Sequence, residues 1–429
     1  MRVPALALVD GEHYPPVVRD ALSALPYDFV CCVNVGGGEK LRSSAQSGEE
    51  LYGVPLADSI EQAVEMYSPE IVVDLSDEPV LGPRERLAAA SRSLALGLPY
   101  AGPDFRFDPP ALEPFALPSV GVIGTGKRVG KTALAIQLAR VCAERLDVVV
   151  VAMGRGGPAE PELRETPPSV EELLALARSG RHAASDYLED ALLGGIVSVG
   201  ARRCGGGLAG AVGYSNVAEA AGIALERHPE LVIFEGSGAA LPPIATDRRV
   251  LVMSAHQDVE LACGYLNAYR VLISDLVVLS FAEPGERLTQ LKQAIAALRP
   301  DLPVIATSMR PRPLEPVAGR KVALFTTAPP QALPALGEHL ERVYGAEVVH
   351  VSGSLARRGE LAEELSRIDA ELFLVELKAA AVDVVIEEAV ARGCEVGLVD
   401  NVLVPLEGEV ELEPALLELA HRARERAAV

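Results

Sequence analysis

The stretch Ser119-Val-Gly-Val-Ile-Gly-Thr-Gly-Lys-Arg-Val-Gly-Lys-Thr132 decides the fold. A β-branched run leads into a glycine-rich turn, and a helical run follows over Lys131–Arg145. A phosphate-binding loop requires this strand–turn–helix context. The turn lets backbone N–H groups converge on phosphate oxygens, and the helix directs its positive N-terminal end to the same point. The stretch therefore predicts a nucleotide-binding α/β domain.

Within this loop, Lys131 is expected to reach the β- and γ-phosphates, and the Thr132 hydroxyl is expected to ligate Mg²⁺. The standard spacing places a glycine five residues before Gly130, where this chain has Thr125; Gly124 lies six before. The alternative is a tight turn that binds nothing. The residues predicted to hold the nucleotide are Gly124, Thr125, Gly126, Lys127, Arg128, Val129, Gly130, Lys131 and Thr132.

On both sides of the loop, strand-like runs alternate with helix-like runs, which is typical of α/β layers around mostly parallel sheets. Two proline-rich stretches, 103–118 and Met309–Lys321, read as joints. The fold class predicted is α/β with a P-loop NTPase-type parallel sheet. The expected domains are an N-terminal Rossmann-like α/β domain (1–115), a P-loop ATP-binding domain (116–318) and a C-terminal α/β domain or extension (319–429). The last segment, Leu412–Val429, is expected to pack on the body as an amphipathic helix.

Acidic residues near the loop are candidate metal ligands. The hydrophobic strand Leu231–Glu235 ends in a carboxylate followed by Gly-Ser-Gly, which is well placed to hold Mg²⁺ directly or through water. The alternative for Glu235 is an ordinary turn acid. Asp186, in the run SDYLED, is either a second metal-side acid or a helix N-cap.

Basic residues follow several predicted strands. Arg155 lies in MGRGGP, Arg202 and Arg203 lie in ARRCGGG, and MRPRP is a third arginine-rich loop. Glycine permits close backbone approach and arginine offers a planar fork of donors, so these loops suggest polyanion sites. Solvated arginines on flexible loops are the alternative.

His256 and Lys378 also follow strands. A lone histidine in such a place is more often structural than catalytic. Lys378 is expected to project from a strand end with Glu376 and Asp383 near it, where a structural ion pair is equally compatible with the sequence.

Polar loops also follow the first three strands of the chain, at Leu8–Pro15, Val33–Leu41 and Asp74–Pro79. Open α/β sheets bind ligands at the carboxyl ends of their strands, so a ligand site is expected at this edge as well.

Composition excludes several function classes. Of 429 residues, 49% are hydrophobic and 23% are charged, an ordinary globular balance. The net charge of −21 disfavours a non-specific nucleic-acid binder and an anionic-membrane binder. No apolar run reaches the ~18 residues of a spanning helix. Six cysteines without C-x-x-C spacing read as free thiols of a cytoplasmic protein, and a homodimer is the default assembly.

Two resemblances follow from these motifs. GTGKRVGKT resembles the phosphate loop of dethiobiotin synthetase and the cobyrinic-acid amidating enzymes, of the form Gly-Thr-x-x-x-Val-Gly-Lys-Thr. The same synthetases end the matching strand in Glu-Gly-x-Gly, as this chain does at Glu235. Related partition ATPases carry a signature lysine in the loop, but Lys127 is one residue away from that position, so no trans-acting role is assigned to it.

The wider combination resembles the cyclic 2,3-diphosphoglycerate synthetase family. It is carried by LVDGEHYPPVV, VGGGEKL, DLSDEPVLG, GTGKRVGKTA, AMGRGGP, GAVGYSN, FEGSGAALPP and VELKAAAVD, spread from Leu8 to Asp383. The resemblance implies an ATP-dependent ligase that converts 2,3-diphosphoglycerate, with Mg²⁺, to its cyclic anhydride, ADP and phosphate.

Under this resemblance each candidate residue has an expected role. The catalytic residues are Lys131, Lys127, Glu235 and Arg155. The metal ligands are Thr132, Glu235 and Asp186. The residues expected to bind the substrate are Arg155, Arg202, Arg203, His256 and Lys378.

Three rival functions remain open at this point. A 2-phosphoglycerate kinase would need a general base, for which His256 or Asp186 is the candidate. The phosphate loop alone also allows a cyclising or amidating ligase that acts on a carboxylate. A nucleotide-switch ATPase is disfavoured, because the outer blocks add ligand-like loops.

Overall fold

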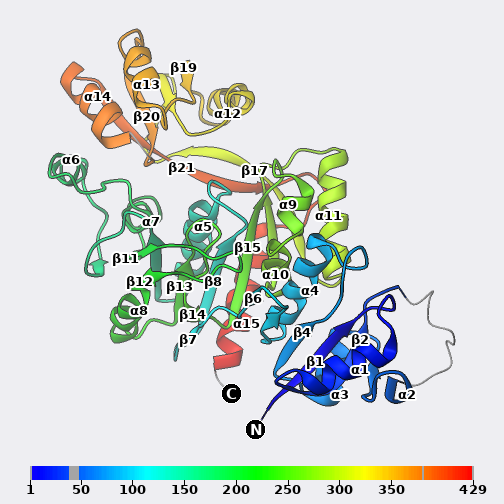
Figure 1. The fold of residues 1–429 in the computed structure, drawn as a ribbon. Helices are drawn as coiled ribbons and strands as arrows, with labels where there is room; N and C mark the ends of the chain where they lie inside the picture. The colour runs from blue at the N-terminus through cyan, green and yellow to red at the C-terminus, as the bar shows by residue number, and fades with distance from the viewer. Residues whose placement is uncertain (1, 38–47, 379–380, 428–429) are drawn as a thin grey trace.

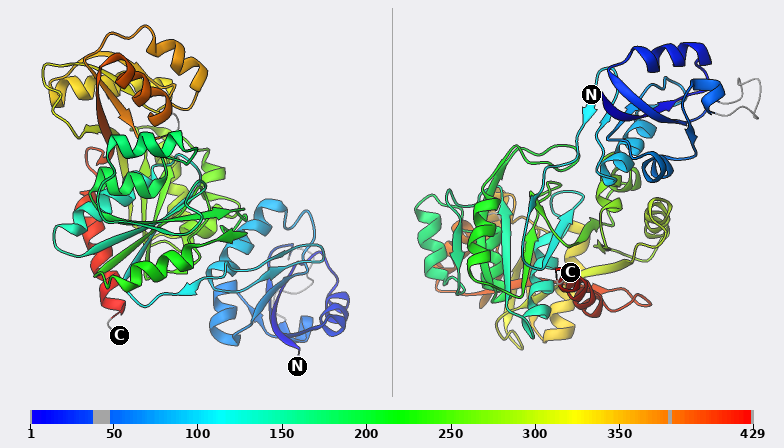
Figure 2. Two further views of the ribbon diagram at one scale, coloured as in Figure 1. Left: turned by 90° about the vertical axis from the view of Figure 1, so that its left-hand side faces the viewer. Right: turned by 90° about the horizontal axis from the view of Figure 1, so that it is seen from below.

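The computed structural model describes residues 2–37, 48–378 and 381–427, and shows three α/β blocks (Figure 1). The first and third blocks lie at opposite ends of the central block, as the two further views in Figure 2 also show. The chain is therefore built around its central block, residues 113–313, which carries the phosphate loop. Glu39 and Lys40, part of one predicted polar loop, lie outside the described residues.

The first block is a six-stranded sheet in the order β3-β2-β1-β4-β5-β6, parallel except for the β5–β6 pair. Its core strands are apolar and buried, as expected for a parallel sheet covered on both faces. Its elements are β1 Val3–Val9, α1 Pro15–Ala24, β2 Tyr27–Asn34, α2 Gly48–Tyr52, β3 Leu56–Ala57, α3 Ile60–Tyr67, β4 Ile71–Asp74, α4 Pro83–Ala95, β5 Tyr100–Ala101 and β6 Arg106–Phe107.

The central block is a larger, mostly parallel sheet in which the loop strand β8 lies between β13 and β15. Its elements are β7 Glu113–Pro114, β8 Ser119–Gly124, α5 Lys131–Ala143, β9 Val148–Gly154, β10 Glu162–Arg164, α6 Val170–Arg178, α7 Asp186–Gly194, β11 Val197–Cys204, β12 Tyr214–Ser215, α8 Val217–Glu226, β13 Leu231–Glu235, β14 Ile244–Ala245, β15 Arg248–Ser254, α9 Val259–Cys263, α10 Asn267–Leu272, β16 Leu276–Ser280, α11 Glu286–Leu298 and β17 Val304–Pro313.

The third block continues the central sheet rather than forming a separate one. β17 pairs antiparallel with β21, and the order then runs β21-β20-β18-β19 with parallel pairing. Its elements are β18 Lys321–Phe325, the 3₁₀ turn η2 Pro330–Ala332, α12 Leu333–Tyr344, β19 Glu347–Ser352, α13 Arg358–Leu365, β20 Leu372–Glu376, the π-helix η3 Ala381–Ile386, α14 Glu387–Arg392 and β21 Glu395–Pro405. Strand pairing gives no boundary at residue 318, so the proposed domain limits stay predictions.

One expected joint is a strand. Met309–Pro313 continues β17 and pairs with β21, with Pro311 opposite Asn401 and Pro313 opposite Val399. A proline cannot donate to a sheet ladder and is confined to unpaired edges. In a strand, the N–H positions of alternate residues face the same side. Pro311 and Pro313 are two residues apart, so both positions that lack an N–H can face the unpaired side of β17, and both prolines fit this strand.

The C-terminal helix α15 (Leu412–Ala427) packs on the central block, as predicted. Leu412, Leu416 and Leu419 are buried in the same core cluster as β8 and α5 residues. The helix thereby covers one face of the sheet behind the phosphate loop (Figure 1).

The first block is attached through helices. α4 packs against α10, and Ser91 Oγ donates to the Tyr265 carbonyl oxygen at 2.8 Å. Core residues of both blocks form one hydrophobic cluster, so the contact is a packed interface.

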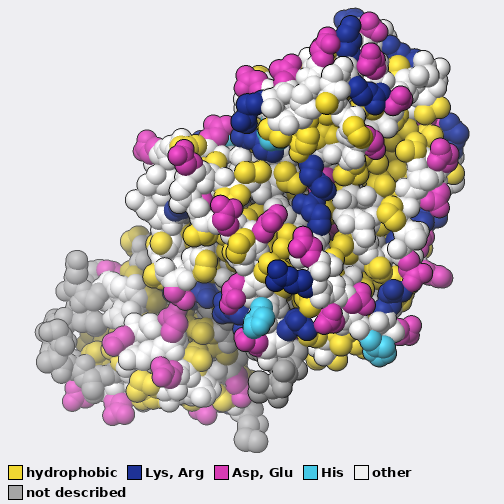
Figure 3. Space-filling model, turned by 180° about the vertical axis from the view of Figure 1, so that it is seen from behind, with side chains coloured by type: hydrophobic (Ala, Val, Ile, Leu, Met, Phe, Trp, Pro, Cys, Tyr) yellow, Lys and Arg dark blue, Asp and Glu magenta, His cyan; other side chains and the backbone are white. Residues whose placement is uncertain are grey.

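The surface agrees with the exclusion of a nucleic-acid binder. On the face shown in Figure 3, basic side chains lie singly or in small groups among acidic ones. Such a mixture does not provide the continuous basic track that a phosphate backbone needs. In the described part of the chain, no helix combines the length and apolarity that crossing a bilayer requires.

Candidate functional site

The phosphate loop has the backbone that its glycines allow. Gly130, the residue before α5, has φ +91°, in the left-handed region that favours glycine. A Cβ at Gly124 would lie 2.9 Å from Lys131 Cδ, so the glycine lets the lysine side chain cross the end of β8. Lys131 is 7% exposed, and its Nζ donates to the Gly126 carbonyl oxygen at 2.8 Å. Burial lowers the pKa of Lys131 to about 8.

Glu235 and Thr132 meet at the start of α5. The Thr132 hydroxyl donates to Glu235 Oε1 at 2.7 Å, while Oε2 is buried and has no hydrogen-bond partner among the residues that the structure describes. Burial raises the pKa of Glu235 to about 8. A buried carboxylate with one unsatisfied oxygen needs a cation or a proton.

These two side chains fit Mg²⁺ in the manner of nucleotide sites. Mg²⁺ is usually held there by one or two protein oxygens together with substrate phosphates and water. Within residues 2–37, 48–378 and 381–427, no group of three or more His, Cys, Asp or Glu side chains is arranged to coordinate a metal ion. Thr132 and Glu235 are therefore the candidate protein ligands for a cation bound together with nucleotide phosphates.

Helix α7 brings three carboxylates to this region. Asp186 is its first residue and Ser185 is the N-cap, so the N-cap alternative for Asp186 is wrong by one position. Burial raises the pKa of Glu189 to about 7 and that of Asp190 well above its usual range. Both Asp190 carboxylate oxygens are buried without a hydrogen-bond partner.

Lys378 reaches this cluster from the third block. Its Nζ forms an ion pair with Glu189 and lies 3.9 Å from Asp186 Oδ1. Although burial opposes the charged form, both carboxylates raise the pKa of Lys378. Glu376 lies beside Lys378 as expected, since the Lys378 backbone N–H donates to its carbonyl oxygen at 2.7 Å and both residues line the same cavity. The ion-pair partner of Lys378 is Glu189, however, and Asp383 pairs with Arg358.

The arginines divide into two groups. Arg155 and Arg203 both point at Gly238, where an added Cβ would lie 2.7 Å from Arg155 Nη2 and 3.3 Å from Arg203 Nη2. Arg203 also donates to the Ser237 carbonyl oxygen at 2.7 Å. Arg202 instead stacks on Tyr214, with its guanidinium 5.8 Å from the ring centroid. The structure therefore brings Arg155 and Arg203 together and leaves Arg202 outside.

A cavity of about 890 Å³ unites most of these residues. On one side are the carboxyl ends of central strands, and on the other are the carboxyl ends of β18, β19 and β20. Of the predicted site residues, those that line it are Lys127, Arg128, Val129, Gly130, Lys131, Thr132, Arg155, Asp186, Glu235, His256 and Lys378.

The remaining predicted residues do not line this cavity. Gly124, Thr125 and Gly126 shape the loop behind it, Arg203 acts on its wall through Ser237, and Arg202 lies away from it. His256 is exposed and stacks on Phe281, with ring centroids 6.0 Å apart.

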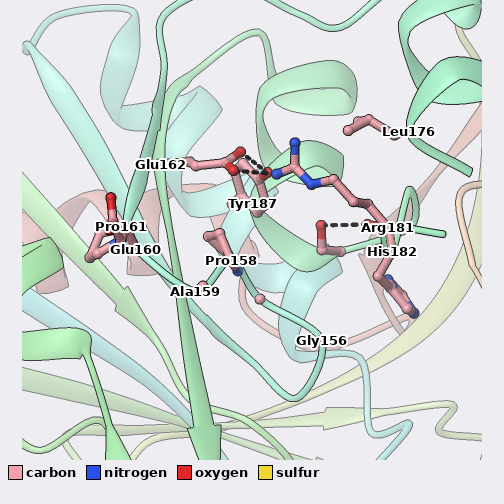
Figure 4. Close-up of a pocket in the computed structure, with 12 residues that line it drawn as sticks. Gly156, Pro158, Ala159, Glu160, Pro161, Glu162, Leu176, Arg181, His182 and Tyr187 are labelled. Carbon is pink, nitrogen blue, oxygen red and sulfur yellow. Dashed lines mark hydrogen bonds and ion pairs between the residues drawn. The ribbon is translucent and has the colours of Figure 1, made fainter. Parts of the chain in front are cut away.

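A smaller pocket of about 580 Å³ adjoins the cavity near His182 (Figure 4). Two of its charged groups satisfy each other, because Arg181 pairs with Glu162, and the Tyr187 hydroxyl donates to Glu162 Oε2 at 2.7 Å. This pocket is therefore a weaker candidate site.

Sequence reasoning missed Glu189 and Asp190. A signal was present, because Asp186, Glu189 and Asp190 are spaced i, i+3 and i+4 and so share one helix face. Nothing local indicated that this face would turn toward the phosphate loop.

Comparisons with known proteins cover nearly the whole chain. Three family models match: the N-terminal domain of cyclic 2,3-diphosphoglycerate synthetase over residues 4–108, its P-loop domain over 119–308 and its C-terminal domain over 313–402. A Rubrobacter xylanophilus protein named cyclic 2,3-diphosphoglycerate synthetase is 48% identical over 438 residues, 97% of each chain. A Thermococcus kodakarensis protein of the same name is 42% identical over 440 residues, 99% of this chain and 100% of that one.

A solved structure, LpxK from Aquifex aeolicus in complex with ATP, is 14% identical, with a TM-score of 0.43 over 73% of this chain and 90% of that one. A likeness of this size carries no argument about function.

Proposed function

The chain belongs to the cyclic 2,3-diphosphoglycerate synthetase family, and from this premise we propose that it closes the ring of 2,3-diphosphoglycerate at the expense of ATP. The products are cyclic 2,3-diphosphoglycerate, ADP and phosphate. We further propose that Mg²⁺ accompanies the nucleotide and that the enzyme works in the cytoplasm as a homodimer.

One observation carries the proposal for the site. The partnerless Glu235 oxygen lies beside the Thr132 hydroxyl, at the mouth of a phosphate loop whose lysine is buried. A bound Mg²⁺ would supply charge neutralisation for the nucleotide phosphates at this point. Lys131 and the N-terminal end of α5 would bind the β- and γ-phosphates.

The reaction proceeds in two displacements. First, an oxygen of one substrate phosphate attacks the γ-phosphorus of ATP, the bond to the β–γ bridging oxygen breaks, and ADP leaves. Second, an oxygen of the other substrate phosphate attacks the activated substrate phosphorus, and the transferred phosphoryl group leaves as inorganic phosphate. The two substrate phosphates become joined in the ring, and no side-chain nucleophile is needed.

The chief obstacle is repulsion between two polyanions. Lys127 and Arg155, which line the cavity and are exposed, are placed to offset it, and Arg203 is placed to hold the Ser237–Gly238 wall beside Arg155. Holding both substrate phosphates side by side supplies proximity, worth up to ~7–11 kcal/mol in favourable intramolecular reactions.

The test is incubation of the protein with ATP, Mg²⁺ and 2,3-diphosphoglycerate, followed by phosphorus NMR. We expect a new pair of anhydride resonances that grows in step with ADP and phosphate. ATP consumption with 2-phosphoglycerate alone would favour a kinase instead. ATP turnover that ignores every acceptor would reject both functions.

A further inference from the structure

The cavity has two chemically different ends. Around Glu235, Asp186 and Arg155 its wall is charged. Beyond the phosphate loop, its wall comes from the ends of β16 and β17 and from the third block, and it combines an apolar part with polar groups such as Arg310 and Arg357. The apolar part is carried by Phe281, Met309, Pro329, Pro330, Ala332 and Ala335. These six side chains offer no hydrogen-bond donor to a phosphate, so they suit another part of the ligand.

The contacts of the phosphate loop indicate how a nucleotide would lie between the two ends of the cavity. Thr132 and Glu235 would hold the metal that accompanies the nucleotide, so the terminal phosphates would lie at this end of the cavity. A Cβ at Gly130 would lie 2.9 Å from Met309 Cε and 3.6 Å from Ser280 Cβ, so the other side of the loop opens toward the apolar wall. The acceptor must reach the γ-phosphate, and the rest of the nucleotide must therefore extend the other way.

Phe281 is held in an unusual conformation at this wall. Its φ is +53°, in the left-handed region that bulky residues rarely adopt. This conformation places Phe281, the residue directly after β16, half-buried at the cavity wall. The His256 ring stacks beside it. Backbone outliers of this kind persist where the surrounding structure enforces them and are concentrated at ligand sites.

The third block supplies the facing surface. Helix α12 packs against β17, and Pro330, Ala332 and Ala335 of this helix and the preceding turn line the cavity, together with Leu336 and the polar Gln331. Pro330 and Ala335 are exposed, so this apolar surface is open to a ligand. Flat aromatic ligands are bound by apolar walls of this kind, with few polar contacts.

We propose that the adenine ring of ATP binds between Phe281 and the α12 wall, so that the third block recognises the base while the charged end of the cavity receives the acceptor. This assignment rests on the proposed function only in taking ATP as the nucleotide. It gives His256 a place beside the base rather than beside the substrate.

The test compares binding of two ligands by titration calorimetry, with Mg²⁺ present and no acceptor. A non-hydrolysable ATP analogue carries the base, and inorganic tripolyphosphate carries only the phosphates. Phe281→Ala removes one stacking face, and Ala335→Gln places a neutral, bulkier side chain on the opposite wall. Val343→Gln is the matched control, because Val343 is 50% exposed on the same helix and does not line the cavity.

Phe281→Ala is expected to bind the ATP analogue at least about fivefold more weakly than the wild type, because it has lost a stacking face. Ala335→Gln should weaken it in the same direction, Val343→Gln should match the wild type, and tripolyphosphate should bind all four proteins equally. If both variants bind the analogue like the wild type, or lose both ligands equally, the assignment is wrong. The binding experiment does not depend on ring closure, so failure of the NMR assay would overturn the proposed reaction and leave this result standing.

Discussion

The first and third blocks are similar in design and differ in what their strand ends do. Each is a small parallel α/β unit with polar residues after its strands. In the first block, Asp10 accepts from the backbone N–H groups of Glu12, His13 and Asp77 and from the His13 ring. In the third block, Lys378 extends into the central block, where it pairs with Glu189. Asp10 is therefore satisfied within the first block, whereas Lys378 completes the lining of the cavity.

The cause of this difference is how each block joins the centre. The third block shares a sheet with it through β17 and β21, which directs its strand ends toward the phosphate loop. The first block is attached through α4 and α10, and none of its described residues, 2–37 and 48–107, lines the cavity. Polar residues after strands therefore predict where the carboxyl edge of a sheet lies. Whether that edge lines a cavity depends on how its block packs against the neighbouring block.

The largest expected effect on activity comes from the phosphate loop, in the central block that lies between the first and third blocks. Lys131→Ala should lower ATP turnover by about 10³-fold or more, because it removes the buried cation nearest the transferred phosphate. The control is Lys321→Ala, an exposed lysine outside the cavity, which should keep full turnover in a coupled ADP assay. Equal loss in both variants would contradict the assignment.

The next prediction separates the two outer blocks directly. Lys378→Ala leaves Glu189 buried without its cation and should cost on the order of 3 kcal/mol of unfolding free energy as well as activity. Asp10→Asn breaks an acceptor of several hydrogen bonds and should cost about 1–3 kcal/mol with turnover unchanged. Urea unfolding and steady-state kinetics on both variants measure this contrast. A turnover loss in Asp10→Asn would place function at the first-block edge.

A pH experiment sharpens the contrast between two buried aspartates. Burial would raise the pKa of Asp10, but hydrogen bonds from Asp77 and His13 outweigh it and lower that pKa. Burial raises the pKa of Asp190, which has no hydrogen-bond partner. Above pH 3.8, the Asp190 carboxyl group ionises in the unfolded chain but stays protonated in the folded protein. Its contribution to stability therefore falls as pH rises. Asp10 behaves oppositely, because its contribution is present above pH 3.8 and is lost as pH falls through its lowered value.

As pH rises above 3.8, Asp190→Asn should accordingly gain stability relative to the wild type, whereas the stability that Asp10→Asn lacks relative to the wild type should shrink as pH falls below 3.8. Urea unfolding across both ranges gives the measurement. Parallel curves for the wild type and Asp190→Asn would mean that Asp190 ionises normally in the folded protein.

The smallest effects should separate neighbouring arginines. Arg155→Ala should raise the KM for the acceptor about tenfold, consistent with the loss of a charge-assisted hydrogen bond. Arg202→Ala should leave that KM within about twofold, because Arg202 stacks on Tyr214 away from the cavity. A larger effect at Arg202 than at Arg155 would show that the acceptor lies elsewhere.

Local patterns were enough to predict the fold class, the strand–turn–helix that holds the phosphate loop, the position of Glu235 at a strand end beside that loop and the packing of the last helix. The loop and Glu235 could be found because each lies directly after a strand whose apolar run is unmistakable. The ion pair between Lys378 and Glu189 joins residues 189 positions apart, and no local pattern encodes such a contact. The continuation of β17 through Pro311 and Pro313 was hidden for a related reason, since only the partner strand β21 explains why prolines are tolerated there.

The most direct test of the account follows one oxygen atom. The substrate is prepared with ¹⁸O at the non-bridging positions of both phosphates, and the released phosphate is examined by phosphorus NMR, where each ¹⁸O shifts the resonance. Activation of one substrate phosphate by ATP, followed by attack of the other, predicts one ¹⁸O in each inorganic phosphate molecule. Phosphate free of ¹⁸O would show that water, not the substrate, receives the γ-phosphoryl group, and would contradict the ring-closing mechanism.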